Sequence, residues 1–260
     1  MNIVKRINNK IFREFTNIAG PKRFCNICGT SFRGKFNPIH QYYTDQIKRT
    51  GYPYNFKDAE TLNYNEYTCP HCESLDRDRL IALYLEKYLN NKSVYRLLDI
   101  APALRLRDYL KSISSIVYRS ADLSMKDVDD NVDLMDMNIY PDCSFDIFIC
   151  SHVLEHVLDD NLAMRELHRI LSIKGFGIVL VPIISQLKDI DEDVTITDPD
   201  ERWKRFGQDD HVRLYSQEGF IERLAGAGFK VSMITINDFS LKEFTLLGLS
   251  PKSVLYILNK

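Results

Sequence analysis

The most constraining feature of this 260-residue chain is an alternation of apolar runs and amphipathic segments over its last two thirds. Short apolar runs predict strands, and apolar residues at every third or fourth position predict helices. A chain that alternates in this way folds into a mostly parallel sheet with helices on both faces, here an α/β fold of about seven strands. The predicted strands are 95–101, 116–122, 132–137, 145–151, 175–183, 230–237 and 253–259, and the predicted helices are 74–90, 159–171 and 216–227.

The composition is typical of a globular protein, with 45% hydrophobic and 27% charged residues. This apolar content is enough for a full core and excludes disordered, collagen-like and low-complexity classes. No apolar run is long enough to span a membrane, so we expect no transmembrane helix. The start of the chain has no apolar segment with a small-residue cleavage site, so we expect no secretory signal and a cytoplasmic location.

The two ends of the chain differ in charge. Residues 1–72 carry 11 Lys and Arg against 5 Asp and Glu, whereas the remainder carries 23 against 31. Such asymmetry indicates modules with different partners. Residues 1–15 predict a basic amphipathic helix that docks on its own domain or, as the less favoured alternative, touches a membrane surface as a peripheral contact. We expect three parts, which are this helix within 1–20, a zinc-binding module at 21–73 and an α/β domain at 74–260.

Four of the six cysteines form two Cys-x-x-Cys pairs, Cys25 with Cys28 and Cys69 with Cys72. Each pair supplies two thiolates from one tight turn, and four thiolates complete the tetrahedral shell of a structural zinc ion. In a chain without a secretory signal this pattern favours a metal site over disulfides, and two pairs together disfavour a single redox pair. We therefore predict Zn²⁺ bound by these four cysteines, with His71 as a bystander.

Acidic and polar residues stand where predicted strands end, at Asp99, Asp122, Asp136 and the Ser151-His152 pair. In an open parallel sheet, ligands bind beyond the carboxyl ends of the strands. An acidic residue that ends the second strand accepts both hydroxyls of a ribose, and Asp122 stands in that position. A dinucleotide needs a glycine-rich turn after the first strand, but that turn is Ala101-Pro102-Ala103 here. The pattern favours a nucleoside cofactor without a phosphate.

The stretch SFDIFICSHVLEHVLDDNLAMRELHRILSIKGFGIVLVPI, residues 144–183, resembles the central region of class I S-adenosylmethionine-dependent methyltransferases. Together with the strand-end aspartates, the resemblance covers residues 95–260. It implies a Rossmann-like class I methyltransferase sheet with S-adenosyl-L-methionine as the cofactor. The chain is also similar to a bacterial subgroup with two Cys-x-x-Cys pairs and segments like CPHCESLDRDRLIALYL (69–85) and DPDERWKRFGQDDHVRLYS (198–216), and that similarity begins at residue 24.

The resemblance implies roles at the matching positions. Asp122, with Leu123 beside it, would hold the ribose, and Asp136 with the Met137 amide would hold the adenine. The methionine part would be lined by Asp99, Ala101, Pro102 and the backbone of Ser151 and His152. Many relatives have Gly-x-Gly after the first strand, and Ala101-Pro102-Ala103 lacks the conformational freedom of those glycines. The position of the cofactor near residues 101–105 therefore stays open.

A polar segment between the fifth strand and the last helix offers candidate catalytic groups. His211 is the predicted base or substrate-orienting residue, supported by Asp209 or Asp210. Arg213 is the predicted contact for an anionic group of the substrate, and His152 is the competing base. A sulfonium methyl is already activated, so the enzyme must hold the acceptor in line and exclude water, and a hydroxyl acceptor also needs a base.

His152, Glu155 and His156 match the His-x-x-Glu-His pattern of one zinc-protease class. The motif begins at the end of a predicted strand and not inside a long helix, so we expect no protease. The exit of that strand also lacks the Asn/Asp-Pro-Pro-aromatic signature that acts on the amino groups of bases, so we expect no DNA substrate.

The favoured function is methyl transfer to a small molecule or a surface-glycan precursor, with oxygen as the expected acceptor atom. The acidity of the α/β part favours a substrate that is not a polyanion. One alternative is an RNA methyltransferase whose basic, aromatic N-terminal module binds RNA. A second alternative is a non-catalytic scaffold, a zinc module on a degenerate methyltransferase fold. The aromatic residues of the module are Phe32, Phe36, Tyr42, Tyr43, Tyr52, Tyr54 and Phe56.

Overall fold

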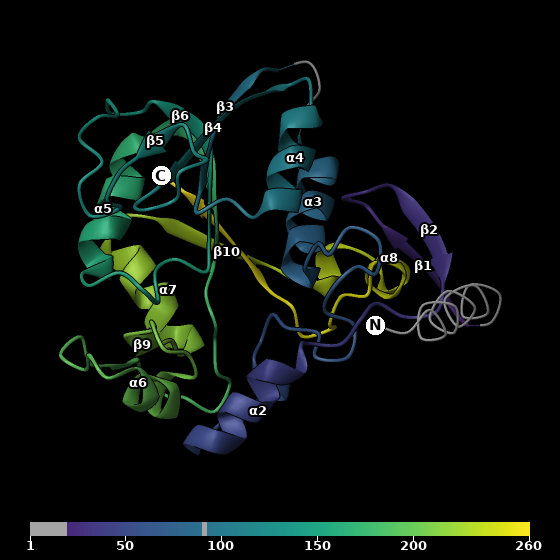
Figure 1. Cartoon of the computed structure of the whole chain (residues 1–260). Helices are drawn as coiled ribbons and strands as arrows, with labels where there is room; N and C mark the ends of the chain where they lie inside the picture. Colours follow the sequence, from purple (N-terminus) through teal and green to yellow (C-terminus); the bar gives the residue numbers. More distant parts are fainter. Residues whose placement is uncertain (1–19, 90–92) are drawn as a thin grey trace.

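The computed structural model describes residues 20–89 and 93–260, and the helix expected at the N-terminus lies outside these residues. Seven strands form the central sheet in the order β10-β11-β7-β6-β3-β4-β5 (Figure 1). The neighbours from β7 to β5 pair in parallel, whereas β11 runs antiparallel to both β7 and β10. The mixed, mostly parallel sheet is therefore confirmed. The strands are β3 Tyr95–Ile100, β4 Ile116–Asp122, β5 Asp130–Asn131, β6 Phe145–Ser151, β7 Leu171–Leu180, β10 Lys230–Ile234 and β11 Leu255–Asn259.

Helices cover both faces of the sheet (Figure 1). Successive strand residues point to opposite faces, so Leu97 and Leu98 of β3 enter two different apolar cores. The core containing Leu97 is closed by α3 Asp76–Tyr88, α4 Leu104–Ser112 and α8 Leu241–Leu247. The core containing Leu98 is closed by α5 Asp160–Ile170 and α7 Gln217–Gly226. This three-layer arrangement leaves the carboxyl ends of the strands at one edge, where a site is expected.

Two strand predictions need correction. The apolar run 132–137 is not a strand, because β5 comprises only Asp130–Asn131 and the chain then turns, with the Asp136 N–H donating to the Asp133 carbonyl at 3.0 Å. Strand β7 begins at Leu171, four residues before the predicted start, because a bulge between β6 and β7 absorbs the polar residues that hid its first part.

The N-terminal segment packs on the α3 and α8 side of the sheet (Figure 1). It contains the hairpin β1 Lys22–Cys25 and β2 Thr30–Arg33, then α2 Gln41–Thr50 and η1 Phe56–Asp58. The buried Arg79 of α3 joins it to the α/β part, since its guanidinium donates to the carbonyls of Ser74 (2.8 Å) and Leu247 (2.7 Å) and lies 3.9 Å from the Phe36 ring centroid. The two parts thus share one buried contact region.

The segment after α2 reaches across to the carboxyl edge of the sheet. The Glu60 N–H donates to the Ile183 carbonyl at 3.0 Å. The Tyr256 hydroxyl donates to Glu60 Oε1 at 2.8 Å, and Thr61 Oγ1 donates to the Val254 carbonyl at 2.9 Å. These contacts place part of the N-terminal module directly over the end of β7.

Several elements were not predicted, although two of them have clear signals. Helix α6, Pro199–Phe206, has Asp198 as its N-cap, proline at its first position and Gly207 in the left-handed conformation at its end. Helix α2 ends at Gly51 in the same conformation, but it buries no side chain, so no apolar period marks it. The others are α4, α8, the hairpin of β1 and β2, the 3-10 helices η1 and η2 Ile236–Asp238, and the short pair β8 Asp191–Glu192 and β9 Arg213–Leu214. Within the described residues, no helix combines the length and apolar character that crossing a membrane requires.

Candidate active site

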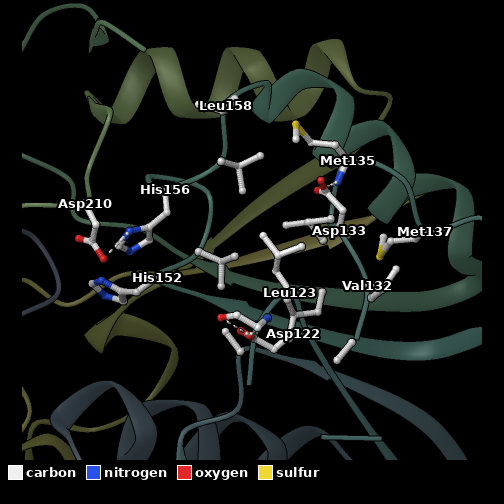
Figure 2. Close-up of a pocket in the computed structure, with 17 residues that line it drawn as sticks. Asp122, Leu123, Val132, Asp133, Met135, Met137, His152, His156, Leu158 and Asp210 are labelled. Atoms are coloured by element: carbon white, nitrogen blue, oxygen red, sulfur yellow. Dashed lines mark hydrogen bonds and ion pairs between the residues drawn. The ribbon is translucent and has the colours of Figure 1, made fainter. Parts of the chain in front are cut away.

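A cavity of about 580 Å³ opens at the carboxyl ends of β3, β4 and β6 (Figure 2). Its volume lies in the range of ligand pockets. Asp122, Asp133 and His152 bring polar groups to a mostly apolar wall that includes Val132 and Leu134. The remaining lining residues are Ile100, Ala101, Ala121, Leu123, Ser124, Met135, Met137, Val153, His156, Val157, Leu158 and Asp210.

Asp122 ends β4 and is held by the turn that follows it. Its Oδ1 accepts the backbone N–H groups of Ser124 and Met125, both at 2.7 Å. One carboxylate oxygen therefore fixes the loop, and the carboxylate stands at the cavity with its second oxygen outside this turn (Figure 2). This is the arrangement that a ribose-binding aspartate requires.

Ala101 adopts a conformation that is usual for glycine. Its φ of 50° lies in the left-handed region, which a non-glycine residue enters at a steric cost. The Ala101 N–H donates to the Ala121 carbonyl at 2.8 Å, so the first residue after β3 turns as a glycine would. The glycine-free loop thus retains the turn that sequence reasoning doubted.

The structure separates the nine predicted cofactor residues into two groups. Those that line the cavity are Ala101, Asp122, Leu123, Met137 and His152; those that do not are Asp99, Pro102, Asp136 and Ser151. The Met137 N–H donates to Glu166 Oε2 at 2.9 Å and Asp136 is exposed, so the predicted adenine contact does not fit this geometry. Asp133 takes the cavity position instead. The sequence VDLMDM contains both aspartates, and only the turn decides which one faces the cavity.

Asp133→Asn is expected to weaken S-adenosylmethionine binding about 10-fold, whereas Asp136→Asn should leave the affinity within about 2-fold, because a hydrogen bond to a charged group contributes about 1.5–3 kcal/mol. The two substitutions make the same chemical change three positions apart. Calorimetric titration of both variants measures the affinities. Equal losses, or a loss confined to Asp136→Asn, would restore the assignment made from sequence.

Asp99 is buried near the end of β3 and does not line the first cavity. Burial raises the pKa of its carboxyl to about 7, although the Tyr118 hydroxyl donates to it at 2.9 Å. The unfolded chain releases this proton near pH 3.8 and the folded chain near pH 7, so the Asp99 contribution to stability is lost as the pH rises through that window.

Asp99→Asn keeps an acceptor for Tyr118 and removes the buried charge. Relative to the wild type, we expect this variant to gain on the order of 3 kcal/mol in the free energy of unfolding between about pH 4 and about pH 8. Urea unfolding followed by circular dichroism at both pH values measures the gain. A difference between the two proteins that does not change with pH would contradict the assignment.

A second cavity, of about 240 Å³, lies behind the first. His152 and His156 line both cavities and form the wall between them. The N-terminal module contributes Tyr43, Tyr52 and Phe56 to the second cavity. Its other lining residues are Ile39, Ala59, Thr61, Leu62, Tyr67, Arg77, Glu155, Val181, Pro182, Ile183, Ile184, Phe206, Gly207, Gln208, His211 and Leu214.

Five ionisable side chains cluster at this shared wall. Glu155 Oε1 lies 3.1 Å from Nδ1 of His152 and 3.9 Å from Nε2 of His156. Nδ1 of His156 lies 3.3 Å from Oδ2 of Asp210 (Figure 2). The rings of His156 and His211 meet edge to face with their centroids 4.7 Å apart. Of the two predicted supporting residues, Asp210 contacts this cluster, whereas Asp209 lines neither cavity.

The cluster holds its members in definite charge states. Burial alone would raise the pKa of Glu155, but the surrounding histidines hold it at about 2. Burial lowers the pKa of His211 to about 4 and also lowers the pKa of His152. At neutral pH, Glu155 is therefore a carboxylate and His211 a neutral imidazole. A pKa so far below neutral makes His211 a weak base, and His152 is the better placed of the two predicted bases.

Arg213 does not fit its predicted role as an anion contact. Its side chain is 1% exposed and pairs with Glu192 at 3.2 Å. Its guanidinium donates to the carbonyl oxygens of Leu154 (2.6 Å) and Leu158 (3.0 Å), and also to that of Val157. These bonds order the turn that carries Glu155 and His156, so Arg213 positions the site from behind.

The four cysteines of the two pairs converge, as the spacing predicted. Their Sγ atoms all lie within 4.8 Å of one another, and those of Cys25 and Cys72 are 3.7 Å apart. Thiolates bound tetrahedrally at about 2.3 Å from zinc lie about 3.8 Å apart, so this set fits the ion. Ser74 Oγ lies 3.3 Å from the Cys25 sulfur and 3.2 Å from the Cys72 sulfur. His71 is exposed and takes no part in the cluster.

The aromatic residues of the N-terminal module serve as core and cavity wall. Phe32 and Phe36 pack around the cysteines, and Tyr52 and Tyr54 pack with Phe206. Of the seven, Tyr42 is the one with an exposed side chain. A stacking platform for single-stranded RNA needs several exposed rings, which this arrangement does not offer.

The sequence motif His-x-x-Glu-His also has a different setting from that of a protease. Residues 152–156 form turns after β6, so the two histidines do not share a helix face. This agrees with the expectation that the motif is not a protease site.

One family model matches part of this chain. The family model described as "Methyltransferase domain" matches residues 90–179, which run from before β3 to the end of β7. No curated protein gives a match to the chain.

Several solved structures match parts of the chain at low sequence identity. The [4+2]-cyclase SpnF is 14% identical with a TM-score of 0.48, and the match covers 86% of this chain and 97% of that chain. A methyltransferase from Archaeoglobus fulgidus is 15% identical with a TM-score of 0.46, over 70% of this chain and 94% of that chain. The CurJ carbon methyltransferase is 14% identical with a TM-score of 0.44, over 70% of this chain and 52% of that chain, so this chain spans about half of its length. These values carry no information about the acceptor.

The matched segment contains the strand ends that form the first cavity, including Asp122, Asp133 and His152. S-adenosylmethionine contains a nucleoside and no phosphate, which is the kind of cofactor that the position of Asp122 and the glycine-free turn led us to expect. Residues 90–179 therefore match a methyltransferase domain, and the strands from β3 to β7 within this range form the parallel part of a Rossmann-like sheet.

Proposed function

We propose that this enzyme transfers a methyl group to a hydroxyl oxygen of a small-molecule acceptor, such as a precursor of a surface glycan. The observation that carries the proposal is the pair of cavities that share His152 and His156 as a wall. The larger cavity has the strand-end aspartates for the nucleoside. The smaller cavity, of about 240 Å³, is suited to a group about the size of one sugar ring, and buried walls favour a small molecule over a polymer.

His152 is the group that we assign as the base. It lines both cavities, and Glu155 holds its Nδ1 at 3.1 Å, an acid–histidine arrangement that leaves the other ring nitrogen for the substrate. In the proposed step, the acceptor O–H gives its proton to His152 while its oxygen forms a bond to the methyl carbon. The S–CH₃ bond breaks and its electron pair stays on sulfur, which leaves S-adenosylhomocysteine, the methyl ether and protonated His152.

We propose that Cys25, Cys28, Cys69 and Cys72 hold a structural Zn²⁺ ion. The four sulfur atoms fill a closed tetrahedral shell, so the ion would have no open position for chemistry. The cytoplasm, where we expect the enzyme to work, keeps such thiols reduced. The zinc would fix the module that supplies the aromatic wall of the acceptor cavity.

The direct test is a transfer assay with isotopically labelled S-adenosylmethionine. One set of acceptors would contain monosaccharides, sugar nucleotides and other hydroxylated small molecules, and the other would contain mixed RNA. We expect label on a small-molecule oxygen and none on RNA. Label on RNA would favour the RNA alternative, and a folded protein that does not bind the cofactor would favour the non-catalytic scaffold.

His152→Asn is expected to lower kcat about 100- to 10,000-fold, the usual contribution of a general base, with little change in cofactor affinity. Asparagine is the suitable replacement because His152 has a φ of 58°, a left-handed conformation that asparagine tolerates well. Steady-state kinetics with calorimetric binding of S-adenosylmethionine separates the two effects. A variant that keeps wild-type kcat would remove His152 from the mechanism.

A further inference from the structure

Three side chains at the shared wall form a second group with the composition of a metal site. Glu155, His156 and His211 each offer a ligand atom, and these atoms all lie within 4.8 Å of one another. The first two stand on the turn after β6, and His211 stands just before β9. The Val212 N–H donates to the Glu155 carbonyl at 3.0 Å and holds the two segments together. The group is separate from the four cysteines.

Two members of the group are buried without hydrogen-bond partners. Glu155 is 1% exposed and His211 is 2% exposed. Neither carboxylate oxygen and neither ring nitrogen makes a hydrogen bond of good geometry with the described part of the chain, although Glu155 Oε1 lies 3.1 Å from Nδ1 of His152. Burial of such groups without partners is costly, so a site with four of these atoms calls for a ligand.

The carboxylate of Glu155 also makes no direct ion pair with an arginine or lysine of the described residues. Among residues 20–89 and 93–260, no arginine or lysine lies within 4.0 Å of its carboxylate. Arg77 lines the same cavity and interacts electrostatically with Glu155, but its Nη1 donates to the Tyr67 hydroxyl at 3.1 Å. A divalent cation would compensate a buried carboxylate that side chains leave uncompensated.

His156 is oriented as a metal ligand would be. Its Nδ1 lies 3.3 Å from the Asp210 carboxylate, and its Nε2 faces Glu155 at 3.9 Å. Metal-binding histidines usually donate one ring N–H to a carboxylate, which fixes the tautomer and leaves the other nitrogen for the ion. Asp210 would serve as this supporting carboxylate, and His152 would orient the Glu155 carboxylate at 3.1 Å.

We propose that Glu155, His156 and His211 bind a divalent transition-metal ion, with Zn²⁺ as the first candidate. Two imidazoles and one carboxylate are the donor set of open zinc and iron sites, which keep at least one position for water or substrate. Bonds of about 2.0–2.2 Å would draw the ligand atoms together by roughly 1 Å. The open position would face the acceptor cavity, where the ion would lower the pKa of a coordinated hydroxyl. This role in acceptor binding rests on the proposed function, whereas the metal site itself does not.

The test begins with the wild-type protein, its cysteine site filled with Zn²⁺, titrated with Co²⁺. Cobalt bound by imidazole and carboxylate gives ligand-field absorption, while cobalt bound by cysteines also gives strong thiolate charge-transfer absorption. We expect the first signal without the second, at one cobalt per chain. Absence of a ligand-field signal, or cobalt entering only with thiolate charge-transfer absorption, would overturn the proposal. This measurement needs no variant and no enzymatic activity.

Variants then locate the ion. Glu155→Gln and His211→Asn should each remove this one metal equivalent, and Asp210→Asn should weaken cobalt binding about 10- to 100-fold, the usual effect of losing a supporting carboxylate. His168→Asn is the matched control. His168 lies on α5, is half-buried against the ring of Phe229 and belongs to neither candidate metal group of the described residues. Circular dichroism shows which variants fold. Unchanged cobalt binding in folded ligand variants would overturn the assignment.

The two proposals can fail separately. A protein that binds cobalt at this site but transfers no methyl to any hydroxyl acceptor would retain the metal site and lose the proposed function. A protein that methylates small molecules with an unchanged rate in chelator, while Co²⁺ gives no ligand-field absorption, would retain the function and lose the metal.

Discussion

Asp122→Ala is expected to weaken the binding of S-adenosylmethionine about 100-fold. A carboxylate that accepts both ribose hydroxyls contributes two charge-assisted hydrogen bonds, each of about 1.5–3 kcal/mol before context effects. Asp122 is the acidic residue that ends β4, and its carboxylate lines the cavity. Calorimetric titration of cofactor and of S-adenosylhomocysteine measures the loss.

The interpretation needs two companions, because Asp122 also accepts hydrogen bonds from the turn at Ser124 and Met125. Asp122→Asn keeps an acceptor for the turn and removes the charge, so it should fold normally and still bind weakly. Asp127→Ala is the matched control, since this exposed aspartate lies in the same loop and pairs with Arg107 at 2.7 Å. Asp122→Ala with wild-type affinity would place the ribose elsewhere.

Cys69→Ser is expected to have the largest effect on stability, a loss on the order of 5 kcal/mol or more, because removal of one thiolate opens the proposed structural zinc site. Cys69 is fully buried, and serine cannot replace the thiolate as a ligand. Thermal unfolding and metal analysis of the purified variant measure both losses. Cys143→Ser, which changes a half-buried cysteine outside the cluster, is the matched control.

Cys69→Ser also distinguishes effects on acceptor binding from effects on cofactor binding. The module that contains the cysteines supplies Tyr43, Tyr52 and Phe56 to the proposed acceptor cavity, whereas the lining residues of the proposed cofactor cavity lie between Ile100 and Asp210. Where Cys69→Ser still folds, KM for the acceptor should rise much more than the Kd of the cofactor. Equal losses at both sites would mean that the module supports the whole sheet.

Much of the fold was predictable because its signals are local. Apolar runs of five to seven residues marked β3, β4 and β6 within about a residue of their ends. The predictions failed where local signals were weak. Helix α2 buries no side chain, β5 has two residues, and a bulge hid the start of β7.

Some residues of the candidate site were also predictable from local sequence signals, and others were not. Spacing alone identified the four cysteines and Asp122, because a tight turn and a strand end fix where these side chains stand. Spacing could not distinguish Asp133 from Asp136, since three residues of an irregular turn decide which one enters the cavity. The metal group joins Glu155 to His211, which are far apart in sequence, and no local pattern records such a contact.

The sequence by itself determined the α/β class, the cysteine cluster and the strand end that carries Asp122, because periodicity and turn chemistry act over a few residues. Only the tertiary structure decided what each polar residue does. Arg213 became a buried support for the turn at residues 154–158, and His152 became the wall between two cavities. The physical reason is that burial, charge pairing and cavity shape depend on segments that meet only after folding.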